Sequence, residues 1–299
     1  MTHNKPKIGW IGCGKMGVPM SGNLIEAGYP LAVWDIVAEN AAQCVENGAS
    51  VAGSIGDLAS TTDIVFSMIT DDAALEAVCL GPGGLIGAAR KGLIYIDMST
   101  VSTVASERVA VAAKEAGVNY LRAPVSGTVA SAIDRKLIVF ASGPEGAYER
   151  CESLLLKIAQ KSYYLGNGEQ ARNLKLAINT MTGLIPAIAA EALTFGLKGG
   201  LDWELMIDMV ENSVAASGMF KLKAQALKNR DYTPAFTAAQ MLKDFGLILD
   251  SAAAVKQPMP LVSLVRQYYL SLVAKGKGNL DYYALLTLWE EIAGVNQSA

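Results

Sequence analysis

Short apolar runs alternate with amphipathic stretches in the first half of the chain. Several of these runs are apolar at every position, as in strands that are buried on both faces of a parallel sheet. They predict strands at residues 7–11, 31–34, 64–68, 93–96, 119–122, 137–141 and 162–165. Helices are expected between them, at residues 16–26, 37–46, 103–116 and 146–159. The alternation predicts an α/β domain with a mostly parallel, doubly wound sheet of the Rossmann type.

The alternation of strands and helices ends at residue 166. No stretch after it has the character of a strand. One long helix is expected at about residues 174–197, followed by helices at 203–212, 218–227, 237–255, 261–274 and 282–293. We therefore predict two domains, residues 1–166 and an all-helical part at residues 167–299, joined by the long helix. That helix contains Asn179, Pro186 and Glu191 in its most apolar stretch, which favours a buried helix over a membrane span.

A glycine-rich turn follows the first predicted strand and opens the first predicted helix. Gly12 permits a tight turn, Gly14 lets the backbone approach a pyrophosphate, and Gly17 allows the helix to pack closely on the strand. The amides and the dipole at the start of a helix bind anions. The pattern predicts a dinucleotide site made by Gly12, Cys13, Gly14, Lys15, Met16 and Gly17. The alternative is a glycine turn that only packs.

An acidic residue ends the second predicted strand. Asp35 stands where a carboxylate accepts hydrogen bonds from the adenosine ribose and repels a 2′-phosphate, and no arginine follows directly. The sequence therefore favours NAD over NADP. Asp35 has an alternative role as the cap of the next helix.

Composition and charge exclude several classes of function. Of the 299 residues, 52% are hydrophobic and 18% are charged, which is typical of a globular protein and excludes global disorder. The net charge is −3 and no basic run is present, so we expect no nucleic-acid partner. The beginning of the chain has no apolar stretch like that of a signal peptide, and we expect a cytoplasmic protein without a membrane segment.

The reactive residue types are few. The four cysteines lack CxxC spacing, which argues against a zinc site and indicates buried, reduced thiols. We expect no metal. The only histidine is His3, which nearly excludes a catalytic histidine and a multi-histidine metal site. A general acid or base must then be Lys, Asp, Glu, Tyr or Cys.

Four further motifs occur in a fixed order. They are Asp-Met-Ser-Thr-Val-Ser at 97–102, Ala-Pro-Val-Ser-Gly-Thr at 123–128, Gly-Asn-Gly with a following Lys and Asn at 166–179, and Met-Leu-Lys-Asp-Phe-Gly-Leu at 241–247. Together with the glycine turn, they make nearly the whole chain resemble the β-hydroxyacid dehydrogenases, such as 3-hydroxyisobutyrate dehydrogenase and tartronate semialdehyde reductase. The resemblance implies that a small 3-hydroxy acid and its semialdehyde are interconverted by hydride transfer to or from the dinucleotide.

One lysine has the position of a proton donor and acceptor. Lys175 and Asn179 lie on one face of the predicted long helix, which is otherwise apolar there. Partial desolvation beside a cofactor cation favours a lowered pKa, so that the amine can take the proton of a substrate hydroxyl. The resemblance implies this catalytic role for Lys175, with Asn179 holding the same oxygen or orienting the amine. Without the resemblance, the simpler interpretation of Lys175 is a lysine that extends from a buried helix so that its amine reaches water.

The resemblance also implies the remaining site residues. Ser126, Gly127 and Thr128 are expected to bind a small carboxylate substrate, although the usual third residue of that loop is glycine. Thr100 is expected beside the nicotinamide or its ribose, and Lys243 is expected to reach both cofactor and substrate, with Asp244 as its neighbour. The expected neighbours of the adenosine ribose are Met68, Ile69 and Thr70. A plain turn at 126–128 and a surface lysine at 243 are the alternatives.

Departures from the family pattern leave the substrate open. Arg122 stands where the family commonly has Asp, and the segment Arg172-Asn173-Leu174 replaces a smaller one. The alternatives are an NADPH-dependent short-aldehyde or imine reductase on the same scaffold, and a non-catalytic dinucleotide-binding protein. Lys175 argues against the former, since imine reductases of this architecture generally lack it. The long apolar helix also predicts a homodimer or homotetramer.

Overall fold

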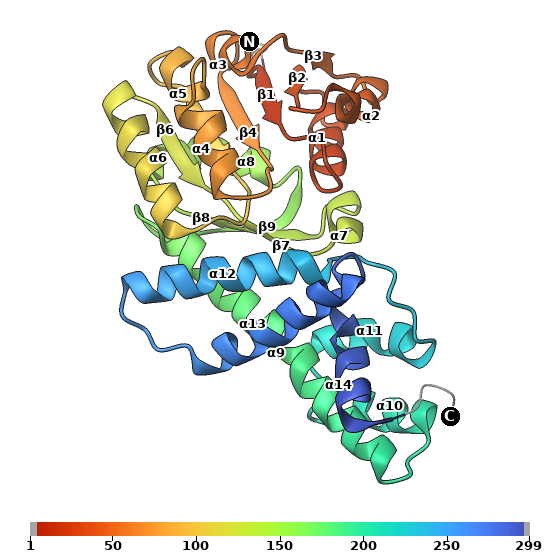
Figure 1. Ribbon diagram of the computed structural model, residues 1–299. Helices are drawn as coiled ribbons and strands as arrows, with labels where there is room; N and C mark the ends of the chain where they lie inside the picture. Colours follow the sequence, from red (N-terminus) through yellow and green to blue (C-terminus); the bar gives the residue numbers. More distant parts are fainter. Residues whose placement is uncertain (1–4, 296–299) are drawn as a thin grey trace. The chain divides into compact units, whose positions relative to one another are not determined.

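The computed structural model describes residues 5–295. These residues form two units that divide between Lys175 and Leu176 (Figure 1). The division falls inside the long helix, whereas the sequence predicts a domain boundary at residue 166. His3 lies outside the described residues.

The first unit is built on a six-stranded sheet. Its strands are β1 (Ile8–Ile11), β2 (Leu31–Trp34), β3 (Ser50–Val51), β4 (Ile64–Ser67), β5 (Ile94–Asp97) and β6 (Asn119–Arg122). They are parallel throughout, in the order β3-β2-β1-β4-β5-β6. This is the strand order of dinucleotide-binding α/β domains. The predicted fold class is therefore confirmed.

A second sheet holds the last two predicted strands of this unit. It has three strands, β7 (Val125–Ser126), β8 (Leu137–Ala141) and β9 (Ala159–Tyr164), with β7 antiparallel to β8 and β8 parallel to β9. The chain leaves β6 through Pro124, whose nitrogen cannot donate to a sheet ladder. One bridge, between Arg122 and Ser142, links the two sheets.

Helices cover both faces of the six-stranded sheet (Figure 1). They are α1 (Gly17–Glu26), η1 (Ala38–Ala41), α2 (Ala42–Glu46), α3 (Ile55–Thr61), α4 (Asp72–Leu80), α5 (Leu85–Ala88), α6 (Thr103–Ala116), α7 (Val129–Ile133) and α8 (Glu145–Leu155). Trp10 stacks on Phe66 on one face, and Tyr95 stacks on Tyr120 on the other. The sheet is therefore buried on both sides, as its continuous apolar runs predict.

The second unit is helical in all the residues that the structure describes there, apart from connecting loops. Its elements are α9 (Gln170–Lys198), which begins in the first unit, α10 (Trp203–Glu211), α11 (Gly218–Lys228), α12 (Ala238–Ala254), α13 (Pro260–Leu272), the π-helical turn η2 (Val273–Lys277), η3 (Tyr282–Ala284) and α14 (Leu285–Ala293). Phe245 of α12 packs edge-on against Tyr269 of α13 in the core of this unit. A capping box, formed by Thr237 and Gln240, begins α12.

Helix α9 is less buried than the sequence predicts. It is long and apolar enough to cross a membrane by length and composition, and 39% of its most apolar window is buried within the molecule. Leu176, Ala190 and Leu193 enter the core of the helical unit. Met181, Ile188 and Phe195 are 69%, 67% and 82% exposed. One face of α9 is thus in the core and another face is apolar and uncovered.

Candidate active site

The glycine turn has the geometry that the sequence predicts. Gly12 has a φ of +95°, and a Cβ atom there would lie 2.2 Å from the carbonyl oxygen of Met68. A Cβ atom at Gly17 would lie 1.9 Å from the carbonyl oxygen of Gly12, so the start of α1 packs directly on the turn. At Gly14 a Cβ atom would meet nothing within 4 Å. The turn therefore leaves open space at Gly14, as close approach of a pyrophosphate to the backbone requires.

A cavity of about 450 Å³ lies beside this turn at the carboxyl ends of β1, β2 and β4. Its walls are mostly apolar and carry a carboxylate, with Gly12, Gly14, Asp35, Ile36, Val37, Asn40, Ile55, Met68, Ile69, Thr70 and Ala74 among the lining residues. The residues described there include no lysine or arginine. An apolar wall next to a glycine turn and a carboxylate fits the adenosine of a dinucleotide, whose base is flat and whose ribose offers hydroxyl donors.

Asp35 connects the second strand to the glycine turn. Its Oδ2 accepts a hydrogen bond from the Cys13 amide at 2.7 Å, and its Oδ1 accepts from the Val37 amide at 2.9 Å. Asn40 Nδ2 donates to Oδ1 at 3.1 Å. Asp35 is not the cap of η1, because that helix begins after Val37 without a side-chain cap. The carboxylate is thus fixed at the cavity wall.

The cysteine in the turn points into the core. Cys13 is buried, and the structure describes all four cysteines as free, buried thiols, which confirms the expectation from the sequence. A hydrogen bond with Cys44 and burial raise the pKa of the Cys13 thiol. The contribution of Cys13 to the turn is therefore its backbone.

The loops after β4 and β5 are joined to each other at the same edge of the sheet. The Ile69 amide donates to Ser99 Oγ at 2.9 Å, and Ser67 Oγ donates to Asp97 Oδ1 at 2.6 Å. Thr100 follows Ser99 directly. The predicted neighbours of the dinucleotide, Met68–Thr70 and Thr100, thus lie on two loops that a shared hydrogen-bond network connects.

The predicted carboxylate loop follows β7. Gly127 has a φ of +143°, and a Cβ atom there would lie 2.7 Å from Leu137 Cδ2, so this position requires glycine. Thr128 begins α7, and its Oγ1 accepts a hydrogen bond from the Ser131 amide at 3.3 Å. This cap explains the threonine that stands where the family usually has glycine. Ser126 is half-buried in β7 and pairs with Ile138 of β8.

The start of α9 is attached to the ends of the strands. The Ala171 amide donates to Ser142 Oγ at 3.2 Å, and Glu169 pairs with Arg122 at 2.5 Å. Arg172 forms a fully buried ion pair with Asp97. Lys175 lies in the next turn of the helix and is half-buried. The sequence did not assign Arg172 a role, although a charged residue at the start of an apolar helix was a usable signal.

Two of the predicted site residues, Asn179 and Lys243, lie in the second unit. Asn179 Nδ2 donates to Asp244 Oδ2 at 2.8 Å, and Lys243 Nζ lies 2.9 Å from Asp244 Oδ1. Because a carboxylate only accepts hydrogen bonds, this contact directs the nitrogen of Asn179 toward Asp244. The amide oxygen then faces a different direction, where it can accept a hydrogen bond from a hydroxyl or an ammonium group. Asp244, 1% exposed, therefore orients both predicted site residues of this unit.

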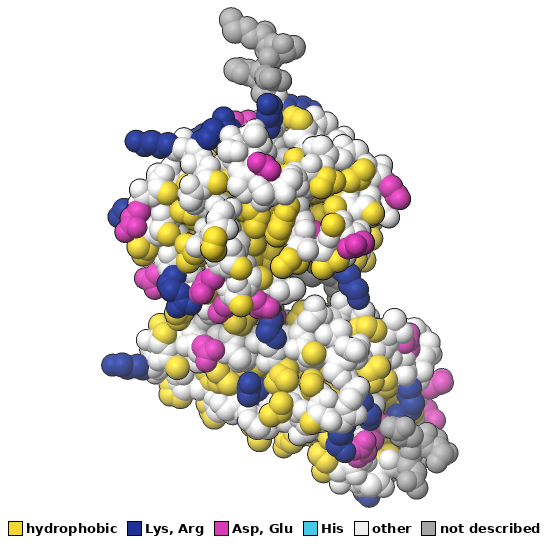
Figure 2. All heavy atoms as spheres, turned by 45° about the horizontal axis from the view of Figure 1, so that its top comes forward, with side chains coloured by type: hydrophobic (Ala, Val, Ile, Leu, Met, Phe, Trp, Pro, Cys, Tyr) yellow, Lys and Arg dark blue, Asp and Glu magenta, His cyan; other side chains and the backbone are white. Residues whose placement is uncertain are grey.

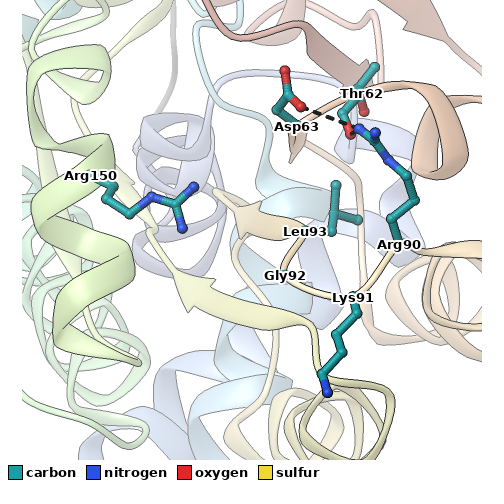
Figure 3. A pocket seen from close by; sticks show the side chains of 7 residues that line it. All are labelled: Thr62, Asp63, Arg90, Lys91, Gly92, Leu93 and Arg150. Atoms are coloured by element: carbon teal, nitrogen blue, oxygen red, sulfur yellow. Dashed lines mark hydrogen bonds and ion pairs between the residues drawn. The ribbon is translucent and has the colours of Figure 1, made fainter.

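A smaller pocket of about 220 Å³ lies beside the amino ends of β4 and β5, at the opposite edge of the sheet (Figure 3). Arg90 reaches across it, donates to the Thr62 carbonyl at 2.6 Å and pairs with Asp63 at 3.3 Å. The Lys91 side chain points away from this pair (Figure 3). The guanidinium is thus used to tie two loops of the sheet together, and this pocket is separate from the candidate site.

Charged side chains of both signs are interspersed on the face that Figure 2 shows, and no continuous basic patch covers it. Among residues 5–295 no group of three metal-ligating side chains is close enough to hold an ion.

Known proteins are similar to this chain over nearly its whole length. The NAD binding domain of 6-phosphogluconate dehydrogenase matches residues 7–166, and the NAD-binding domain of NADP-dependent 3-hydroxyisobutyrate dehydrogenase matches residues 168–289. The chain is 31% identical to 2-(hydroxymethyl)glutarate dehydrogenase of Eubacterium barkeri, over 98% of the chain and 97% of that protein. It is 32% identical to a mitochondrial 3-hydroxyisobutyrate dehydrogenase-like protein of Arabidopsis thaliana, over 99% of the chain and 89% of that protein.

A solved structure is similar over the same range. Mycobacterium tuberculosis 3-hydroxyisobutyrate dehydrogenase with L-serine superposes with a TM-score of 0.87 at 26% identity, over 95% of this chain and 99% of that one.

Proposed function

Because the chain belongs to the β-hydroxyacid dehydrogenases, which are oxidoreductases acting on CH–OH groups, we propose that it transfers hydride between a small 3-hydroxy acid and NAD. The observation that carries this proposal is that the predicted site residues of the first unit lie at one edge of the six-stranded sheet. The glycine turn, Asp35, the loops after β4 and β5, and the attached start of the lysine-bearing helix all lie at the carboxyl ends of the strands.

The residues of the chain have separate tasks in this reaction. A dinucleotide held at the glycine turn and beside Asp35 would supply the acceptor for the hydride of the substrate carbon. Lys175 takes the proton of the substrate hydroxyl in oxidation and returns a proton to the carbonyl in reduction, so that the alcohol and the semialdehyde interconvert. Asn179, oriented by Asp244, accepts a hydrogen bond from the amine or the hydroxyl through its oxygen. Ser126 and the backbone at Gly127 hold the carboxylate, which places the hydroxyl-bearing carbon.

The preference for NAD is supported by the cavity wall. Asp35 is fixed there by the Cys13 and Val37 amides, and the lining residues provide no cation for a 2′-phosphate. Discrimination between the two dinucleotides thus follows from a charge that the fold holds in place.

The direct test is turnover of a panel of 3-hydroxy acids with NAD and with NADP. We expect oxidation of small 3-hydroxy acids, with a higher kcat/KM for NAD. Turnover confined to aldehydes or imines that lack a carboxylate, together with a preference for NADPH, would contradict the proposal. Tight dinucleotide binding without turnover of any of these compounds would instead indicate a non-catalytic protein.

Two further properties are proposed with this function. A homo-oligomer is supported by the exposed apolar face of α9. A reducing, cytoplasmic location is supported by the four buried free thiols.

A further inference from the structure

A buried guanidinium lies at the start of the helix that carries Lys175. Arg172 is 1% exposed, and its partner Asp97, at the end of β5, is 0% exposed. Burying such a pair carries a large desolvation cost. The reaction described above gives neither residue a task, so the position of the pair needs an explanation.

The guanidinium reaches the loop that precedes Thr100. Arg172 Nη1 donates to the Ser99 carbonyl at 2.5 Å, and Nη2 both pairs with the Asp97 carboxylate and lies 3.1 Å from Tyr120 Oη. Burial alone would lower the pKa of Arg172, but the charge of Asp97 and the hydroxyl of Tyr120 raise it. The guanidinium therefore stays protonated.

The carboxylate partner extends this connection to a second loop. Asp97 Oδ1 accepts from Ser67 Oγ and from Ser99 Oγ, each at 2.6 Å. Ser99 Oγ accepts in turn from the Ile69 amide at 2.9 Å. One ion pair thus joins the first turn of α9 to the loops after β4 and β5, which are the loops expected to border the ribose and the nicotinamide.

A second, largely buried ion pair holds the chain just before α9. Arg122 pairs with Glu169, and Arg122 lies beside Asp97 in the register of β6 on β5. The two ion pairs therefore start from register partners at the ends of two neighbouring strands. The entry of α9 is fixed at residues 169 and 172, directly before the turn that carries Lys175.

We propose that Arg172 is a positioning residue: paired with Asp97, it fixes the first turn of α9 on the two dinucleotide loops and thereby sets where the Lys175 amine stands. The inference rests on the proposed function, because it takes Lys175 as the group that moves the proton. Proton and hydride transfer require reacting atoms at close approach, and a displacement of about 1 Å costs on the order of 10²-fold in rate.

The test removes both charges together. Single variants leave a buried charge without its partner, whereas replacing both members of a buried pair is often tolerated. In Asp97→Asn with Arg172→Met, an acceptor oxygen remains for Ser67 and Ser99, and the methionine retains much of the length of the arginine chain. We expect kcat to fall by roughly 10- to 100-fold. KM for NAD should stay within about threefold of the value for the unmodified protein. The two substitutions remove no interaction that binds the dinucleotide equally in the ground state and the transition state.

Two comparisons separate positioning from general stability. Arg172→Lys keeps a cation opposite Asp97, and we expect it to retain more of kcat than the double variant does. The matched control is Arg230→Met with Glu290→Gln, a pair in the helical unit whose side chains are 26% and 1% exposed. This control should leave kcat unchanged. A primary deuterium isotope effect that rises only in the Asp97/Arg172 variant would show that hydride transfer has become slower.

Hydrogen exchange of the backbone amides tests the anchoring of α9 in the absence of substrate. Hydrogen exchange should become faster at residues 98–101 and 169–176 in the Asp97/Arg172 double variant and should stay unchanged there in the control. Unchanged exchange, or a kcat equal to that of the unmodified protein, would overturn the inference. Faster exchange, in a protein whose unmodified form oxidises no 3-hydroxy acid, would contradict the proposed function and support the anchoring by Arg172.

Discussion

At the scale of single residues, Lys175 has the clearest expected effect. Lys175→Ala removes the proton acceptor and leaves the glycine turn and Asp35 in place. Loss of general acid–base catalysis costs roughly 10²–10⁴-fold in rate, so kcat should fall by that factor while NAD affinity, measured by fluorescence titration, barely changes. Lys175→Arg should not restore activity, because a guanidinium stays protonated at working pH.

Ser126→Ala provides the contrasting substitution for Lys175→Ala. The hydroxyl of Ser126 is expected to bind the substrate carboxylate equally in the ground state and the transition state, so its loss should raise KM and leave kcat nearly unchanged. A near-normal kcat in Lys175→Ala, or a defect limited to NAD binding, would return Lys175 to a structural role.

A substitution of Asp35 tests the predicted preference for NAD over NADP. Asp35→Ser combined with Ile36→Arg removes the repelling carboxylate and adds a cation at the cavity wall. The ratio of kcat/KM for NADP to that for NAD should rise at least about tenfold, which corresponds to about 1.4 kcal/mol. Ile36→Arg alone is the control, since it leaves the carboxylate in place. A higher kcat/KM with NADP in the unmodified enzyme would show that Asp35 has a different role.

Residues with a backbone requirement were predictable from the sequence, and residues with a long-range partner were not. Gly12 and Gly17 are fixed by local sterics, and the pattern of the turn alone indicates both. Arg172 meets Asp97 only because β5 and the start of α9 are brought together by the fold. Without a partner in view, Arg172 was simply a departure from a family pattern.

At the scale of elements, substitutions of Thr128 test whether its hydroxyl caps α7 or contacts the substrate. Thr128→Ala should lower the free energy of unfolding by about 1 kcal/mol, the usual cost of losing an N-cap, and Thr128→Ser should not. For a protein of this size the change in Tm is about 2–4 °C, which calorimetry resolves. An unchanged Tm together with a raised KM in Thr128→Ala would assign the hydroxyl to the substrate and not to α7.

Strands of four or more residues and several helices were predictable, and the two-residue strands were not. The predicted strands at residues 31–34, 119–122 and 137–141 coincide with β2, β6 and β8, and α6 was predicted to the residue. Strands β3 and β7 have two residues each, too few for a pattern of alternation. The separate sheet of β8 and β9 also lay beyond the sequence pattern, because the pairing of strands depends on which edges the fold leaves available.

At the scale of the whole molecule, α9 determines the last prediction. Met181, Ile188 and Phe195 are seven residues apart, so they lie along one face of the helix, and each is at least 67% exposed. Apolar side chains are also visible on the helical unit in Figure 2. An apolar face of this kind is stabilised when a second surface covers it, at about 25 cal/mol for each Å² removed from water.

A second copy of the chain is the partner that is always present, and two-fold pairing buries the same patch on both subunits. We therefore expect a dimer or tetramer in light scattering at micromolar concentration. Ile188→Glu with Phe195→Glu should shift the protein toward monomer, because the interface would then have to bury four carboxylates. Val214→Glu, at a fully exposed apolar position outside α9, is the control and should leave the mass unchanged. A monomer in the unmodified protein would contradict the assignment of this face.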